Sequence, residues 1–198
     1  MSQKKPDMPL VDGTDLYFGI VAARYNNDLV EALLERVRAT LRQSRVGESS
    51  IKVLRVPGAA ELPYVANMLA QTGEYDCIIV LGVIVKGDTN HDRVLANSTA
   101  LSLQGIAMQT EVPVINGILT VNTRAQAEVR INGEADRGAE FAAAALEMAW
   151  HRVQLSDYLD NLDNEEARER AASEYLEFGS DDEDDDDFNT GRPPFHKN

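Results

Sequence analysis

The chain has 198 residues, of which 43% are hydrophobic, so it is long enough to bury one sizeable core. Its formal net charge of −14 is uneven, because residues 155–198 contain fifteen acidic and four basic side chains, leaving only −3 for residues 1–154. This balance argues against nucleic acid as the main partner, since binding to a phosphate backbone needs clustered Lys and Arg.

The sequence also argues against disulfide, zinc and membrane proteins. The single Cys77 excludes an internal disulfide and, within an apolar run, is predicted to be a small buried side chain. Neither a CxxC nor an HExxH spacing occurs, so a zinc site has no support. The N-terminus lacks an apolar signal segment, and no apolar run is as long as a membrane span. We therefore expect a soluble, cytoplasmic protein without a metal.

Apolar runs typical of strands alternate along the chain with segments of helical periodicity. The run at 77–85 is rich in Ile and Val without polar alternation, which is typical of a strand buried on both faces of a parallel sheet. Asn26, Asn27 or Asp28 can cap the first helix. In chain order we predict a flexible arm at 1–15, strand 16–23, a helix with apolar residues from Leu29 to Leu41, strand 50–56, helix 61–71, strand 77–85, helix 92–108, strand 112–119, a short helix at 126–130 and helix 138–153.

This β-α-β-α-β-α-β-α order predicts an α/β fold with a parallel sheet and helices on both faces, because short right-handed crossovers return each strand to the same sheet. Polar and small residues follow the strands at Tyr25, 59–61, 87–91 and 116–122. Open α/β sheets bind ligands at the carboxyl ends of their strands. We therefore expect these segments to meet in one site.

The loop after the third strand carries the most chemistry. Gly87 lets the backbone approach an anion, and Thr89 with the amides of the first helical turn can cradle a phosphate. His91 is then near enough to transfer a proton to or from the molecule that bears the phosphate. From position alone, a locally hydrogen-bonded histidine is an equally good interpretation of His91. Similarly, Glu61 is explained by the helix dipole alone, and Tyr25 by the edge of the core.

The C-terminal segment has its own pattern. An apolar stripe of Leu155, Tyr158, Leu159 and Leu162 runs among acidic residues, so the last helix continues or restarts as an acidic amphipathic extension at 155–178. The acidic run within 179–198 repels itself, and we expect a disordered tail there. This tail either solubilises the protein or attracts a basic partner or cargo, and the sequence leaves both interpretations open.

Five segments, in order, resemble the lumazine synthase family. The similarity covers about residues 16–150, which is most of a predicted domain at 16–154. One such motif would be weak, whereas five at compatible spacings make a specific signal. The segments are GIVAARYN (19–26), VPGAAELP (56–63), GVIVKGDTNH (82–91), PVINGILT (113–120) and QAEVR (126–130).

The resemblance implies a flavodoxin-like three-layer α/β/α subunit with a four-stranded parallel sheet. It implies a transferase of riboflavin biosynthesis that condenses 5-amino-6-(D-ribitylamino)uracil with 3,4-dihydroxy-2-butanone 4-phosphate. The product is 6,7-dimethyl-8-ribityllumazine, and phosphate and water are released without a metal or organic cofactor. Family members are homopentamers with sites at subunit interfaces, and some assemble into a hollow 60-mer shell.

The resemblance also implies individual roles. His91 takes the place of the proton-transfer residue, Tyr25 stacks on the pyrimidine and Glu61 binds the ribityl hydroxyls. Asn116 falls where family members present a residue, often Phe, from the neighbouring subunit. The residues expected to contact the pyrimidine and the ribityl chain are Tyr25, Ala59, Ala60, Glu61, Val83, Ile84, Val85 and Asn116. Those expected to contact the phosphate and the butanone are Gly87, Asp88, Thr89, Arg130 and Arg137.

Two other functions stay open. Asp92 follows His91 where the family usually has Phe or Tyr, and together with the acidic tail it motivates a catalytically weak or inactive scaffold or container. A flavin- or nucleotide-binding module of flavodoxin type is the second, and it is weaker because no GxGxxG follows the first strand.

Overall fold

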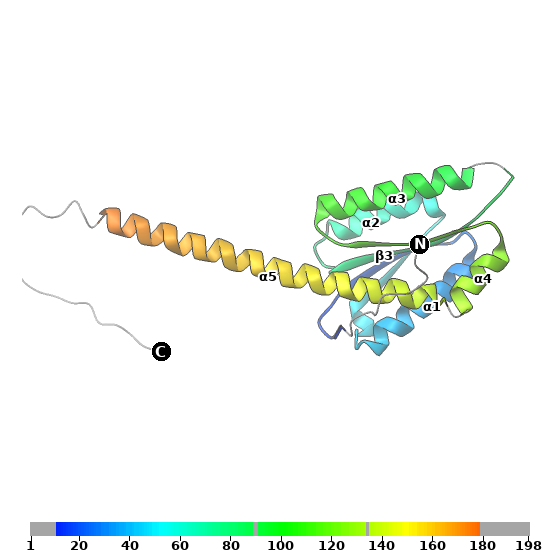
Figure 1. The fold of residues 1–198 in the computed structure, drawn as a ribbon, viewed down its shortest axis with the longest axis horizontal. Helices are drawn as coiled ribbons and strands as arrows, with labels where there is room; N and C mark the ends of the chain where they lie inside the picture. Colours follow the sequence, from blue (N-terminus) through cyan, green and yellow to red (C-terminus); the bar gives the residue numbers. More distant parts are fainter. Residues whose placement is uncertain (1–10, 89–90, 134, 179–198) are drawn as a thin grey trace, which may run out of the picture. The chain divides into compact units, whose positions relative to one another are not determined.

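The computed structural model of the protein describes residues 11–88, 91–133 and 135–178 (Figure 1). The alternation of strands and helices predicted from the sequence is confirmed. Two short 3-10 helices, η1 and η2, flank the second strand. The elements are β1 Phe18–Ala23, α1 Asn27–Gln43, η1 Glu48–Ser50, β2 Ile51–Val56, η2 Ala59–Glu61, α2 Leu62–Ala70, β3 Cys77–Val85, α3 His91–Thr110, β4 Val114–Val121, α4 Arg124–Asn132 and α5 Arg137–Phe178.

The four strands form one parallel sheet in the order β2-β1-β3-β4. β3 is the long central strand, and every residue from Cys77 to Ile84 is buried, as its continuous apolar run predicted. Burial also raises the pKa of the Cys77 thiol, which keeps this side chain protonated and unreactive. The pairing of β1 with β3 ends at Ala22 and Leu81, whereas β3 pairs with β4 as far as Val85.

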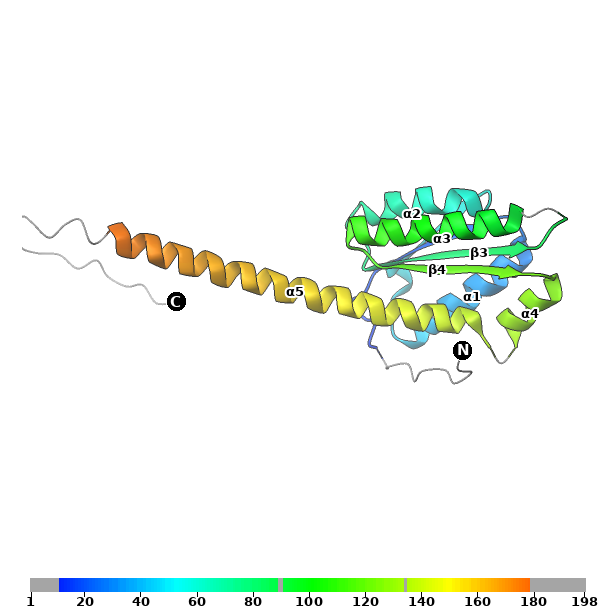
Figure 2. The same cartoon turned by 45° about the horizontal axis from the view of Figure 1, so that its top comes forward.

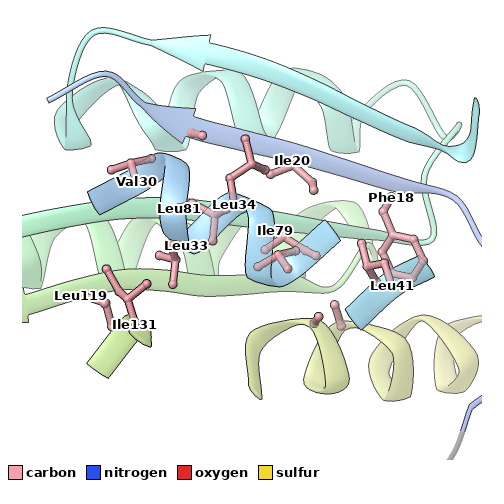
Figure 3. Packing of buried hydrophobic residues seen from close by; sticks show 14 of the residues in the cluster. Phe18, Ile20, Val30, Leu33, Leu34, Leu41, Ile79, Leu81, Leu119 and Ile131 are labelled. Atoms are coloured by element: carbon pink, nitrogen blue, oxygen red, sulfur yellow. The ribbon is translucent and has the colours of Figure 1, made fainter. Parts of the chain in front are cut away.

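Helices cover both faces of this sheet and complete the predicted flavodoxin-like α/β/α fold (Figure 2). Side chains of β3 alternate between the two faces. Ile79 and Leu81 pack with Leu33 of α1 and Ile131 of α4, on the face that also receives the start of α5 (Figure 3). Ile78 and other alternate residues pack beneath α2 and α3. Fully burying each Leu or Ile contributes roughly 1.5–3 kcal/mol, so these two clusters hold the layers together.

The ends of most elements lie within one or two residues of the prediction, and β4 illustrates the reason for the shifts. We predicted a strand at 112–119, and it lies at Val114–Val121. Pro113 has no N–H to donate, so the regular ladder begins after it. At the other end, the carbonyl of Val121 accepts a hydrogen bond from the N–H of Lys86 at 2.9 Å, which keeps the strand paired to its last residue.

The last helix continues past residue 153 through the predicted extension at 155–178, so of the two expected alternatives it continues rather than restarts. α5 runs uninterrupted to Phe178, because no Gly or Pro stands between Gly138 and Gly179 to end it. The chain divides into two units, one ending at Leu155 and the other beginning at Ser156. In the first unit, α5 buries Ala142, Ala145, Leu146 and Ala149 in the core.

In the second unit, the described side chains of α5 are exposed, including Tyr158 at 60% and Leu159 at 59%. Residues 1–10 of the predicted arm and the predicted tail at 179–198 lie outside the described residues. Within the described part of the chain, no helix is both long and apolar enough to cross a membrane.

Arg152 fastens α5 to the amino-terminal edge of the sheet. Its guanidinium donates to the Asp76 carboxylate and to the Glu111 carbonyl, each at 3.2 Å. The other oxygen of Asp76 accepts from the N–H of Tyr17 at 2.9 Å. The Asp76 side chain is only 17% exposed, so its charge needs these donors. The Asp76 carboxylate thus joins the residues that precede β1 and β3 to α5.

We expect Asp76→Ala to lower the free energy of unfolding by about 1–3 kcal/mol, because it leaves the Tyr17 N–H and the Arg152 guanidinium without their acceptor. Urea denaturation at fixed protein concentration measures the change. The matched control is Arg170→Ala, which breaks an exposed pair with Glu166 within α5 and should cost less than about 0.5 kcal/mol. Equal costs for the two variants would contradict this role of Asp76.

Candidate active site

A cavity of about 520 Å³ opens at the carboxyl ends of β1, β2 and β3. The chain passes from β1 to β2 on one side and then crosses to β3 on the other, so the cavity lies where the strand order reverses. At such a point the two connections diverge to opposite faces of the sheet and leave a crevice between them. Four segments line it: the end of β1 with the turn that follows, the turn containing η2, the end of β3 with Gly87, and the first turn of α3.

Most of the predicted site residues lie in the wall of this cavity. They come from segments far apart in the sequence, which supports the expectation that the carboxyl ends of the strands meet in one place. Asp88 is exposed in the loop after β3 and is not part of the wall, and Thr89 lies outside the described residues. The predicted residues that line the cavity are Tyr25, Ala59, Ala60, Glu61, Val83, Ile84, Val85, Gly87 and His91.

Asn26 joins two of these segments. It precedes α1 with φ 53° and ψ 46°, a left-handed conformation that Asn tolerates better than most residues. We expected a side chain among Asn26, Asn27 and Asp28 to cap the helix, but Asn26 makes no capping hydrogen bond. Its amide nitrogen instead donates to the carbonyl of Val83 at 2.8 Å. Asn26 was not predicted to be a site residue, because a capping role already explained it.

The backbone of β3 supplies polar groups to the cavity. In a strand, successive residues direct their N–H and C=O groups to opposite neighbours. The N–H of Lys86 donates to β4, so Ile84 also faces β4, whereas Val83 and Val85 face the side where β1 has ended. The Asn26 contact with Val83 agrees with this direction. The peptide groups of Val83 and Val85 can therefore bind the polar edge of a flat molecule.

Glu61 closes the turn that forms the opposite wall. Its Oε2 atom accepts from the N–H of Gly58 at 2.8 Å and so stabilises η2. A Cβ at position 58 would lie 3.2 Å from this oxygen, so glycine there lets the carboxylate approach closely. Glu61 therefore has a structural role at the start of the helix, as the helix-dipole interpretation predicted. A carboxylate has about four lone-pair sites, so Glu61 retains acceptor capacity for a bound molecule.

His91 is the first residue of α3 and lies exposed in the cavity wall. The neighbouring Asp92 also lines the cavity but is only 9% exposed. Tyr25 is 76% exposed and contributes an aromatic ring to the cavity wall. Among the described residues, no group of three or more His, Cys, Asp or Glu is arranged to hold a metal ion. The site therefore combines an imidazole, an aromatic ring, carboxylates and backbone groups.

Residues 15–152 match the model of the 6,7-dimethyl-8-ribityllumazine synthase family. The chain belongs to this family. It is 45% identical over 132 residues to the 6,7-dimethyl-8-ribityllumazine synthase of Xylella fastidiosa (strain 9a5c), an alignment covering 66% of this chain and 86% of the relative. It is 41% identical over 136 residues to the synthase of Xanthomonas euvesicatoria pv. vesicatoria (strain 85-10), covering 68% of this chain and 88% of the relative. The resemblance inferred from the five motifs is thereby confirmed, and the protein is a transferase of the lumazine synthase family, which functions in riboflavin biosynthesis.

Three residues for which the lumazine synthase resemblance implied site roles do not line the cavity of their own chain. Asn116 lies in the first half of β4, opposite Val80, and its Oδ1 accepts from the N–H of Ile118 at 3.1 Å. Arg130 is exposed on α4 and donates to a carbonyl one turn earlier. Arg137 begins α5 and pairs with Glu140. All three residues are exposed on the surface of this chain.

We expect Asn26→Ala to destabilise the protein more than Asn26→Gly. Both variants lose the hydrogen bond to Val83, which costs about 1 kcal/mol. Ala keeps a Cβ in the left-handed conformation without the polar side chain that lets Asn tolerate it, whereas Gly relieves this strain of about 1–2 kcal/mol. Thermal unfolding at matched protein concentration compares the two. At most positions Gly is less stabilising than Ala, because Gly loses more conformational freedom on folding. A glycine variant less stable than the alanine variant would therefore refute the left-handed backbone of Asn26.

Proposed function

We propose that this protein condenses 5-amino-6-(D-ribitylamino)uracil with 3,4-dihydroxy-2-butanone 4-phosphate to give 6,7-dimethyl-8-ribityllumazine, phosphate and water. The observation that carries the proposal is the meeting of Tyr25, Glu61 and His91 around one cavity of about 520 Å³. This volume falls within the usual range for small-molecule sites. Family membership supports the class of reaction.

The amine substrate has a flat ring and a polyhydroxylated chain, and the cavity offers a group for each. Tyr25 provides a face on which the pyrimidine stacks. The peptide groups of Val83 and Val85 bind the polar edge of the ring. The small residues Ala59 and Ala60 leave room for the ribityl chain, and Glu61 accepts hydrogen bonds from its hydroxyls. The ring therefore lies against β3 and the chain against η2.

His91 moves protons in the proposed mechanism. When the amine adds to the ketone, the nitrogen must lose protons and the departing oxygen must gain them as water leaves. Elimination of phosphate then requires removal of a proton from the carbon next to the imine. Imidazole is suited to both tasks near neutral pH, and His91 stands in the cavity wall close to Gly87, where the phosphate-bearing substrate would enter.

The phosphate needs a cation that the described wall of the cavity does not supply. Among the described residues, the cavity wall contains the carboxylates of Glu61 and Asp92 but no Lys or Arg. We propose that the backbone N–H groups of Gly87 and Asp88 and the hydroxyl of Thr89 of one chain hold the phosphate together with Arg130 and Arg137 of a neighbouring copy, and that Asn116 of that copy borders the pyrimidine. A forked guanidinium is a strong phosphate partner. This arrangement requires a homo-oligomer, which we propose to be a pentamer.

We expect His91→Ala to lower kcat by about 10²- to 10⁴-fold while the substrates still bind, because the variant loses only proton transfer. Formation of the lumazine absorbance in a mixture of both substrates measures the rate. The matched control is His151→Gln, since His151 lies on α5 against Trp150 and outside the cavity, and its rate should equal that of the wild type. An undiminished rate in His91→Ala would reject the mechanism, and a blank wild-type assay would favour the scaffold or container.

A mixing experiment tests whether two chains share the site. His91→Ala and Arg130→Ala are each expected to be nearly inactive, but hybrid oligomers of both should recover part of the activity. In a hybrid, the Arg130→Ala chain supplies His91 and its neighbour supplies Arg130, so intact sites form at some interfaces. Co-expression with two affinity tags isolates the hybrids for the absorbance assay. Hybrids as inactive as both parents would show that the two residues do not meet across an interface.

A further inference from the structure

Asp92 combines burial, charge and a missing partner in the wall of the cavity. Its side chain stands in the first turn of α3, is 9% exposed, and lines the cavity beside His91 and Leu95. Its Oδ1 atom is fully buried and has no hydrogen-bond partner among the residues that the structure describes. A buried carboxylate oxygen without a donor destabilises a protein, so its presence at the site needs a reason.

No cavity side chain nearby is placed to be the missing donor. His91 is adjacent in the helix, and neighbours in sequence do not face each other on a helix. The side chain of Glu61 is a carboxylate and accepts rather than donates. The amide of Asn26 is directed to the carbonyl of Val83. Oδ1 is covered in the free protein, so a molecule bound in the cavity can supply the donor once the Asp92 carboxylate rotates and brings this oxygen to the cavity surface.

The position in the helix explains how Asp92 is tolerated in the free protein. The N-terminal turn of a helix favours negative charge, because its first N–H groups lack partners within the helix. The dipole acts on the charge as a whole, whereas the unpartnered oxygen still requires a directed donor. The other buried polar side chain of α3 provides a contrast, since the hydroxyl of Thr99 is bonded to the carbonyl of Leu95 at 2.8 Å.

We propose that Asp92 is a substrate-binding residue that accepts a hydrogen bond from an O–H or N–H group of the amine substrate. This inference rests on the proposed function and adds a residue to it. The phosphate-bearing substrate is the less suitable partner, because a carboxylate repels its dianion. α3 packs against η2, so Asp92 and Glu61 present two acceptors along one cavity. Such a pair suits a chain that carries several hydroxyl donors.

The test compares Asp92→Leu, Asp92→Asn and the control Thr99→Val in the full-length assembled protein. Calorimetric titration with 5-amino-6-(D-ribitylamino)uracil alone measures binding without turnover, and thermal unfolding without ligand measures stability. We expect Asp92→Leu to weaken binding of the amine at least tenfold and to raise the Tm, because it removes a buried carboxylate oxygen that has no hydrogen-bond partner among the described residues. Asp92→Asn keeps one acceptor oxygen and should lose less affinity. Thr99→Val should bind the amine as the wild type does.

Two results would overturn the inference. One is unchanged amine binding in Asp92→Leu at any Tm. The other is a lowered Tm with equal loss of affinity for the amine and the butanone phosphate, which would show that Asp92 only supports the fold. The wild-type assay separates this inference from the proposed function. Product formation by the wild type with unchanged binding in Asp92→Leu rejects the inference alone, whereas no product from the wild type rejects the proposed function.

Discussion

The difference in length between two neighbouring strands is the constraint on which the site depends. β1 stops pairing with β3 at Ala22 and Leu81, but β3 continues with β4 to Val85. The end of β3 is therefore held on one side and open on the other. Backbone polar groups that would have been used in the sheet face a cavity instead. The Asn26 side chain spans the gap and holds the turn after β1 against β3.

The two edges of the sheet perform different tasks. At the amino-terminal edge, Asp76 and Arg152 join α5 to the segments that precede β1 and β3. At the carboxyl-terminal edge, the cavity wall has carboxylates without cations among its described residues. The two edges therefore differ in chemistry, because one is closed by an ion pair and the other presents acidic side chains to a cavity.

The fold was largely predictable from the sequence, because apolar runs and short connections are features of local segments of the chain. The unalternating run at 77–85 required a strand covered on both faces, and short connections required parallel crossovers. Shifts at strand ends came from the partner strand, as at Val121, whose pairing with Lys86 extended β4 beyond its apolar run. The wall residues of the cavity were also predictable, because strand ends converge. Asn26 was not, since its local context explains a cap equally well.

The amino-acid sequence by itself determined the layers, the strand alternation and the family, because apolar periodicity and five ordered motifs are properties of short segments. Tertiary structure alone decided where β1 stops relative to β3, that the Asn26 amide donates to the Val83 carbonyl, and that Asp92 is buried beside the cavity without a described partner for Oδ1. These facts depend on contacts between segments distant along the chain. A linear pattern of residues does not specify such contacts until the elements pack.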